Sequence, residues 1–216
     1  MLMRVLRLLT RKQIFTLIGI NMKTSRQYVQ TQRARAAEET RERILDAFVG
    51  LVISRSSVAI PLQDVARQAG VTVQTILRRF GSRDRLFDEA LVHGQAMIAG
   101  EREAPAGDAV VALSVLVDHY ELRGDAVLAL LATENADPRI ARIVDAGRET
   151  HRRWVAEVFA DALLARSPDD RVDTARLLVV ATDVYAWKLL RRDMALTRSD
   201  AERHLLRLVG AVLSAN

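Results

Sequence analysis

From residue 38 onward, apolar residues recur every three or four positions, and this helical periodicity constrains the fold more than any other feature of the sequence. Ile44, Phe48, Leu51 and Val52 fall on one side of a helix, the side that an amphipathic helix buries. No stretch alternates between apolar and polar residues and then ends in a turn pair, so strands are not expected. The pattern predicts an all-α chain.

Capping and turn residues divide the region 38–100 into four short predicted helices. The first is expected to begin at Thr40, whose hydroxyl can accept a hydrogen bond from a free backbone N–H. Gly70 is expected to end the second, and Thr72 and Ser82 are the expected N-caps of the third and fourth.

The remaining sequence predicts longer helices. They are expected over residues 108–122, 125–134, 139–165 and 169–192, with a last helix capped by Ser199. Residues 177–190 are apolar on almost every side of their helix, so this segment needs burial on more than one face. A two-fold interface between two copies of the chain supplies such burial, and the sequence therefore predicts a homodimer.

The net charge of +5 comes from one end of the 216-residue chain. Residues 1–36 hold eight basic residues and no acidic one, whereas the other 180 residues carry 24 basic and 27 acidic residues. A basic arm of this kind suits nucleic acid or anionic lipid. Three interpretations of residues 1–36 stay open: a flexible basic tail, an over-extended gene start, or an arm that binds DNA. The longest charge-free run, residues 13–22, is too short to span a bilayer and no cleavage pattern follows it, so a cytoplasmic protein without stable membrane association is expected.

The residues that most catalytic and metal sites need are absent or far apart in the sequence. The chain has no cysteine, which excludes disulfides, thiolate metal sites and a cysteine nucleophile. Its four histidines lie at least 26 positions apart, and it contains neither a phosphate-binding glycine loop nor a G-x-S-x-G sequence. No catalytic residue, metal or cofactor is therefore expected. Two other classes remain as alternatives: a helical enzyme with a dispersed active site, and a helical membrane-surface protein anchored by residues 1–36.

Residues 62–80, LQDVARQAGVTVQTILRRF, carry the most informative functional pattern. They predict two short helices joined by a tight turn, in which Gly70 can adopt a positive φ. Ala66 is small where the two helices would cross. The residues expected to fill the space between them are Val65, Val71 and Ile76. This is the pattern of a helix-turn-helix motif, which places its second helix in the DNA major groove.

The second helix offers hydroxyl, amide and guanidinium groups suited to base edges and phosphates. Gln74 and Thr75, in its first turn, are expected to read bases, while Arg78 is expected to read guanine or to bind phosphate. The candidate DNA-binding residues are Thr72, Val73, Gln74, Thr75, Arg78, Arg79, Ser82 and Arg83.

The flanks of this motif extend the pattern to residues 40–91. An amphipathic helix, then VARQAGVTVQTILRRF, then GSRDRLF resemble the DNA-binding domain of the tetracycline-repressor (TetR) family of bacterial regulators. The resemblance implies three parts: a basic extension (1–36), a helix-turn-helix domain of three helices (37–92), and a larger helical bundle for ligand binding and dimerisation (93–216). It implies a homodimeric repressor that binds a palindromic operator in double-stranded DNA and is released by a small molecule.

The sequence departs from the family pattern at Leu77. The family commonly has a tyrosine there that donates a hydrogen bond to a phosphate, which leucine cannot do, so Arg78 or Arg79 is expected to replace it. The family's Ser-Lys pair at the start of the next helix is Ser82-Arg83 here. Arg83 keeps a cation beside a helix N-terminus, where a phosphate would bind.

Aromatic and polar residues on otherwise apolar segments of the second half are the candidates for lining a ligand site. They are His119, Tyr120, Trp154, Asp183, Tyr185 and Trp187. Aromatic residues at helical spacing equally suit an ordinary hydrophobic core. Asp183 interrupts an apolar run, where a buried carboxylate needs a partner such as an arginine or a cationic ligand.

Overall fold

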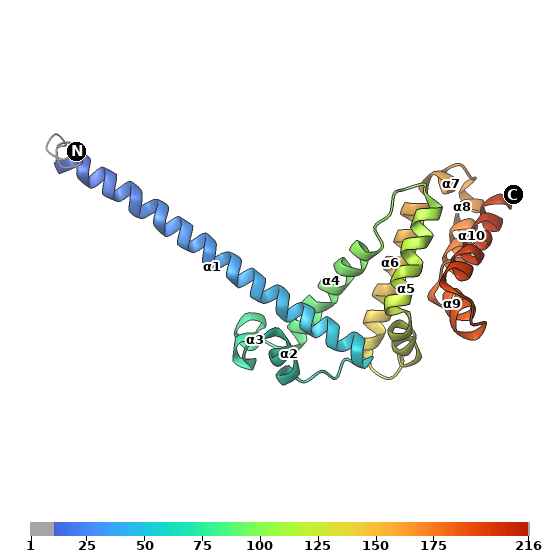
Figure 1. Cartoon of the computed structure of the whole chain (residues 1–216), viewed down its shortest axis with the longest axis horizontal. Coiled ribbons are helices and arrows are strands. Elements are labelled where there is room, and N and C mark those ends of the chain that lie inside the picture. The colour runs from blue at the N-terminus through green and yellow to red at the C-terminus, as the bar shows by residue number, and fades with distance from the viewer. Residues whose placement is uncertain (1–10, 216) are drawn as a thin grey trace. The chain divides into compact units, whose positions relative to one another are not determined.

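The computed structural model describes the backbone of residues 11–215 and the side chains of residue 28 and residues 30–215. Within these ranges the regular elements are helices, which confirms the all-α prediction (Figure 1). The chain divides into two compact units, Met1–Ile44 and Leu45–Asn216. No helix within the described residues has the length and hydropathy of a membrane-spanning segment.

The first helix, α1 (Arg11–Arg55), begins well before the predicted start at Thr40. The Thr40 hydroxyl donates to the carbonyl of Ala36 at 2.7 Å, so Thr40 lies inside the helix and the prediction that it is an N-cap was wrong. The helix continues through Thr40 because residues 20–49 contain neither glycine nor proline, the residues that commonly end a helix. Residues 1–10 of the basic extension lie outside the described residues, and the three interpretations of the extension stay predictions.

Three helices follow α1, and their ends agree with the predicted caps. They are α2 (Leu62–Ala69), α3 (Val73–Phe80) and α4 (Arg83–Glu101). The Thr72 hydroxyl accepts a hydrogen bond from the N–H of Thr75, and the Ser82 hydroxyl accepts one from the N–H of Arg85, both at 3.1 Å. Both residues are therefore N-caps, as predicted.

Helix α5 (Ala109–Ala132) runs through the break that the sequence predicted after residue 122. Gly124, at that break, is buried inside the helix and lies against the indole of Trp187. The glycine is therefore where an aromatic ring packs directly on the helix backbone, not where the helix ends.

The C-terminal part of the chain contains more and shorter helices than the sequence predicted. It contains α6 (Pro138–Val158), α7 (Ala160–Leu164), α8 (Pro168–Ala181), α9 (Val184–Lys188), the π-helical turn η2 (Leu189–Asp193) and α10 (Arg198–Ser214). The predicted helix over 139–165 is broken at Phe159, and the one over 169–192 is broken at Thr182 and Asp183. The last helix is capped by Thr197, whose hydroxyl accepts from the N–H of Asp200, so the prediction of Ser199 as its cap was wrong.

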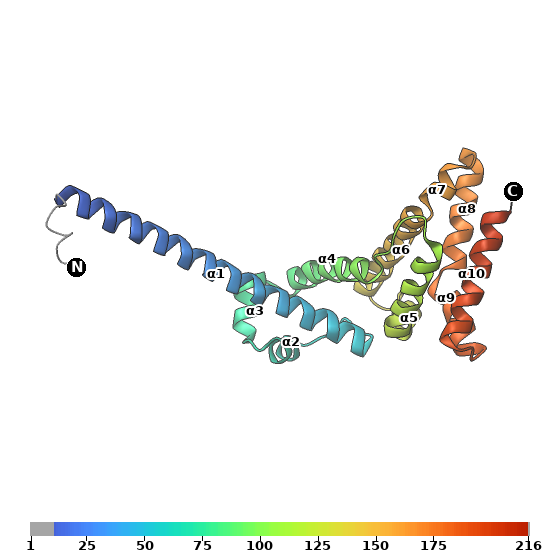
Figure 2. The same cartoon turned by 45° about the horizontal axis from the view of Figure 1, so that its top comes forward.

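The helices from α5 onward share one hydrophobic core. Its buried members include Leu113 and Leu116 of α5, Trp154 of α6, Leu178 of α8 and Trp187 of α9. Helix α10 packs against both α5 and α8, and Figures 1 and 2 show these helices side by side. Within the described residues, one face of α8, which carries Leu177 and Val180, stays exposed.

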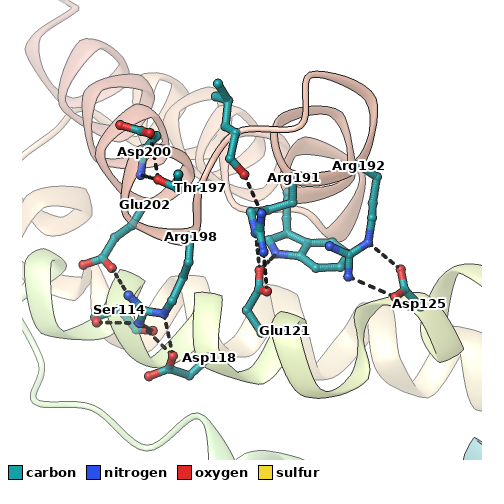
Figure 3. Close-up of polar contacts among 12 residues, drawn as sticks. Ser114, Asp118, Glu121, Asp125, Arg191, Arg192, Thr197, Arg198, Asp200 and Glu202 are labelled. Atoms are coloured by element: carbon teal, nitrogen blue, oxygen red, sulfur yellow. Dashed lines mark hydrogen bonds and ion pairs between the residues drawn. The ribbon is translucent and has the colours of Figure 1, made fainter.

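Arginines of η2 and α10 bind acidic residues spaced along α5 (Figure 3). The pairs are Arg191–Glu121, Arg192–Asp125 and Arg198–Asp118. Arg191 binds both carboxylate oxygens of Glu121, at 2.6 and 2.8 Å, which holds the pKa of Glu121 below its ordinary value. These contacts orient the end of the chain on α5.

Candidate nucleic-acid interface and ligand pocket

Helices α2 and α3 form the predicted helix-turn-helix. Gly70 ends α2 with φ 67° and ψ 38°, a left-handed conformation that glycine adopts without strain. The N–H of Val71 then donates to the carbonyl of Ala66 at 2.9 Å, which closes the turn. Val65 and Ile76 are fully buried and Ala66 is buried beside them, as the sequence predicted, whereas Val71 is only half-buried.

Helix α3 leaves its polar side chains open to solvent. Gln74, Arg78 and Arg79 are exposed, and within the described residues neither arginine has an ion-pair partner. Thr72 is exposed, but its hydroxyl is already used as the N-cap and lies 3.0 Å from the Thr75 hydroxyl. The amide of Gln74 and the two guanidinium groups are therefore free for a partner. The hydroxyl pair of Thr72 and half-buried Thr75 also keeps one O–H that can donate.

The remaining residues of the predicted DNA-binding set lie at the edges of this surface. Val73 is half-buried, and Ser82 is exposed with its hydroxyl used as the cap of α4. Arg83 is half-buried and donates to the carbonyl of Val58 at 3.3 Å. Leu77, where the family commonly has tyrosine, has 41% of its surface exposed.

A pocket of about 410 Å³ lies among α1, α4, α5, α6, α8 and α9. Four of the predicted ligand residues line it: His119, Tyr120, Asp183 and Tyr185. The structure places the two tryptophans elsewhere. Trp154 borders a neighbouring pocket of about 360 Å³, and Trp187 is fully buried in the core.

Asp183 caps α9. One of its carboxylate oxygens accepts from the N–H of Tyr185 at 2.9 Å, and no arginine of the described residues forms an ion pair with it. An N-cap carboxylate is stabilised by the backbone N–H groups of its helix, so it does not need an arginine partner.

Arg102, a pocket residue that the sequence did not single out, is buried at the end of α4. Its Nη1 donates to Nδ1 of His151 at 3.5 Å, and Nε2 of His151 lies 3.1 Å from the hydroxyl of Thr182. Since Nδ1 accepts, the proton of His151 is on Nε2, which can donate to Thr182. The Trp154 indole N–H donates to the Arg102 carbonyl at 3.1 Å and fixes the backbone there.

A second polar cluster joins α4 to α5. The carboxylate of Glu101 accepts from Arg123 Nε at 2.7 Å and lies 2.9 Å from Nδ1 of His119. The Arg123 guanidinium holds the pKa of Glu101 below its ordinary value. Burial, followed by the charge of Arg102, lowers the pKa of His119 to about 4, and the same two causes lower that of His151 to about 4. Both histidines are therefore neutral at pH 7.

These histidines predict a loss of stability in mild acid. Between pH 6.5 and about 4, the unfolded chain binds a proton at each histidine and the folded chain does not, so the free energy of unfolding falls as the pH falls. Each histidine contributes a slope of up to about 1.4 kcal/mol per pH unit. Urea unfolding at pH 4.5, 5.5, 6.5 and 7.5 measures how the free energy of unfolding depends on pH. His151→Gln should remove one of the two contributions, and an unchanged slope in that variant would contradict the assignment.

Residues 44–90 match the family described as bacterial regulatory proteins, tetR family. This segment of the chain belongs to the TetR family. That is a family of regulatory proteins, in agreement with the expectation that the chain is not an enzyme. Over 62 residues, the chain is 42% identical to the HTH-type transcriptional regulator AlkX of Mycobacterium tuberculosis. That match covers 29% of this chain and 27% of AlkX.

Solved structures show the same fold over most of the chain. A TetR-family transcriptional regulator from Rhodococcus sp. superposes with a TM-score of 0.59 at 21% identity, covering 82% of this chain and 100% of that chain. One from Mesorhizobium loti superposes with a TM-score of 0.56 at 16% identity, covering 82% of this chain and 96% of that chain. The helices after α4 therefore have the arrangement found in TetR-family structures.

Proposed function

We propose that this chain is a cytoplasmic DNA-binding transcriptional regulator: a homodimeric repressor that binds a palindromic operator and leaves it when a small molecule occupies the pocket. The observation that carries the proposal is the surface of α3. Its free amide and guanidinium groups, Gln74, Arg78 and Arg79, follow a turn closed by Gly70, in the part of the chain that matches the family. In this proposal residues 37–92 are the DNA-binding domain and residues 93–216 bind ligand and form the dimer.

The position of the pocket supports coupling between ligand and DNA. Its wall includes Phe48 of α1 and Phe87 of α4, which contact each other edge to face at 6.4 Å. Helix α4 also packs against α3. A ligand that changes the position of α4 therefore changes that of the recognition helix. Such a ligand must bind the DNA-free conformation more tightly, and by reciprocity operator DNA must weaken ligand binding.

DNA selected from a genomic pool with the purified full chain tests the proposal. We expect enrichment of a palindrome that binds at least about a thousandfold more tightly than a scrambled duplex at physiological salt. Equal binding of both duplexes, lost on deletion of residues 1–36, would assign DNA binding to the basic extension and contradict the role of α3.

Gln74→Ala tests base reading by α3. We expect the variant to lose affinity by about five- to a hundredfold for each half-site of the selected operator, and to discriminate less at one base position in each half-site, because a good side-chain contact to a base edge contributes about 1–3 kcal/mol. Binding to matched and singly mismatched duplexes measures this loss. Arg152→Ala, on the exposed surface of α6, is the control and should leave both affinities unchanged. A uniform loss across all duplexes would make Gln74 a positioning contact.

A further inference from the structure

Arg102 brings a cation into the wall of the pocket without a counter-charge. Only 7% of its surface is exposed, and its Nε is buried with no hydrogen-bond partner among the described residues. The other arginines lining the pocket are paired with acids: Arg123–Glu101, Arg148–Glu134 and Arg152–Glu149. Arg102 forms no such pair within the part of the chain that the structure describes.

The surroundings of Arg102 hold its charge in place but do not neutralise it. The guanidinium lies 5.3 Å from the centre of the Tyr120 ring and donates to a neutral histidine, His151. The Glu101 carboxylate next to it in sequence binds Arg123 and His119 instead. Burying a cation without an anion is costly, and leaving a buried donor unpaired adds to the cost. A bound anion would remove both costs.

The rest of the pocket is suited to an apolar body. Its wall includes Phe48, Val52, Phe87, Val127 and Leu130. The volume of about 410 Å³ falls within the range of small-molecule sites, in which a few polar groups fix the orientation of a largely apolar ligand. The pocket thus combines one buried cation, Arg102, with a largely apolar wall.

We propose that the pocket binds an apolar molecule carrying one carboxylate, with the carboxylate on the Arg102 guanidinium and the apolar body against α1, α4 and α5. A planar guanidinium matches a carboxylate in shape and charge, which a neutral or cationic head group does not. The proposal rests on the function proposed above only in taking this pocket as the ligand site of the regulator.

Three probes with the same alkyl chain and different head groups test the proposal: decanoate, 1-decanol and decylammonium. Titration calorimetry on the full chain at pH 7 measures their affinities. We expect decanoate to bind at least about tenfold more tightly than 1-decanol, because hydrogen bonds between two charged groups are stronger than those to a neutral hydroxyl, and decylammonium to bind most weakly. Equal affinities for decanoate and 1-decanol, or tighter binding of decylammonium through Asp183, would overturn the proposal.

Arg102→Met separates the charge from the shape of the site. The variant removes the guanidinium and keeps an unbranched apolar side chain, so decanoate should bind about ten- to a hundredfold more weakly while 1-decanol binds as before. Since the substitution removes a buried charge that lacks a partner, the unliganded variant should unfold at no lower a temperature than the wild type. Arg102→Lys should recover part of the affinity for decanoate.

Arg152→Met is the matched control. Arg152 also lines the pocket, but its side chain is exposed and paired with Glu149 at 2.8 Å, so decanoate binding should not change. A loss in Arg152→Met without a loss in Arg102→Met would place the anion on the pocket rim and overturn the proposal.

Operator binding of the same preparations keeps the two proposals separate. Decanoate binding that depends on Arg102, without any selected operator, would support the ligand class and contradict the regulator. A selected operator, together with equal binding of decanoate and 1-decanol, would support the regulator and contradict the proposed ligand class.

Discussion

Gly124→Ala is expected to lower the free energy of unfolding by about 3 kcal/mol, because the new methyl group would overlap a buried ring. A Cβ on Gly124 would lie 2.6 Å from Cη2 of Trp187 and closer still to Cζ3. The ring cannot easily move aside. Trp187 is fully buried, its indole N–H donates to Glu121 at 2.8 Å, and the Arg192 guanidinium lies 4.5 Å from the ring centre.

A glycine-to-alanine substitution at Gly147 should instead raise the free energy of unfolding. Gly147 lies within α6, and a Cβ there would meet nothing within 4 Å. Gly147→Ala should therefore raise the free energy of unfolding by about 0.5–1 kcal/mol, since alanine is the better helix former. Urea unfolding monitored by circular dichroism compares the two variants with the wild type.

A double variant identifies the clash as the cause. Trp187→Phe removes the part of the ring that overlaps the new methyl group, so Gly124→Ala should cost less in the Trp187→Phe background than in the wild type. Equal costs in both backgrounds would attribute the loss to something other than the ring. Gly124→Ala with wild-type stability would refute the packing of Trp187 against the α5 backbone.

Gly124 also shows why part of the fold could not be predicted from sequence. A glycine within an apolar helical pattern commonly marks an end, and the sequence alone predicted a break near this position. The residue that explains the glycine is Trp187, 63 positions along the chain. By contrast, Gly70, Thr72 and Ser82 act on their immediate neighbours, so the caps of the helix-turn-helix followed from the sequence.

The candidate sites differ in the same way. The surface of α3 could be predicted, because one short helix places Gln74, Arg78 and Arg79 there by its own periodicity. The pocket could not, since Arg102 is one of 29 arginines and its burial depends on α4, α5 and α6 together. Aromatic residues at helical spacing fit core and pocket alike, and only the tertiary structure separates Tyr120 from Trp187.

Leu177→Glu/Val180→Glu is expected to convert the proposed dimer into a folded monomer. Leu177 and Val180 lie one turn apart on α8 with 52% and 68% of their surfaces exposed, and Leu208 on the adjacent α10 is 47% exposed. Large apolar side chains gathered on neighbouring helices are typical of an interface. If these side chains form the two-fold interface, each glutamate would bring a charge into an apolar contact, which disfavours assembly.

The consequence for DNA should be larger than that of any change in α3. A palindromic operator is bound by two recognition helices, whose spacing only a dimer fixes. The double variant should therefore bind the selected operator at least about a thousandfold more weakly, near the level of non-specific binding. Sedimentation equilibrium at micromolar concentration measures the assembly, and binding to the operator and to a scrambled duplex measures the affinity.

Val110→Glu provides the control for added charge. Val110 is 59% exposed and lies in the first turn of α5, where an acidic side chain favours the helix, so this variant should remain dimeric and bind DNA normally. Because the substituted side chains of α8 are exposed in the single chain, the monomer should keep the wild-type circular dichroism spectrum. A double variant that stays dimeric and binds the operator fully would place the interface elsewhere, whereas a monomeric variant with undiminished affinity would show that operator recognition needs only one copy.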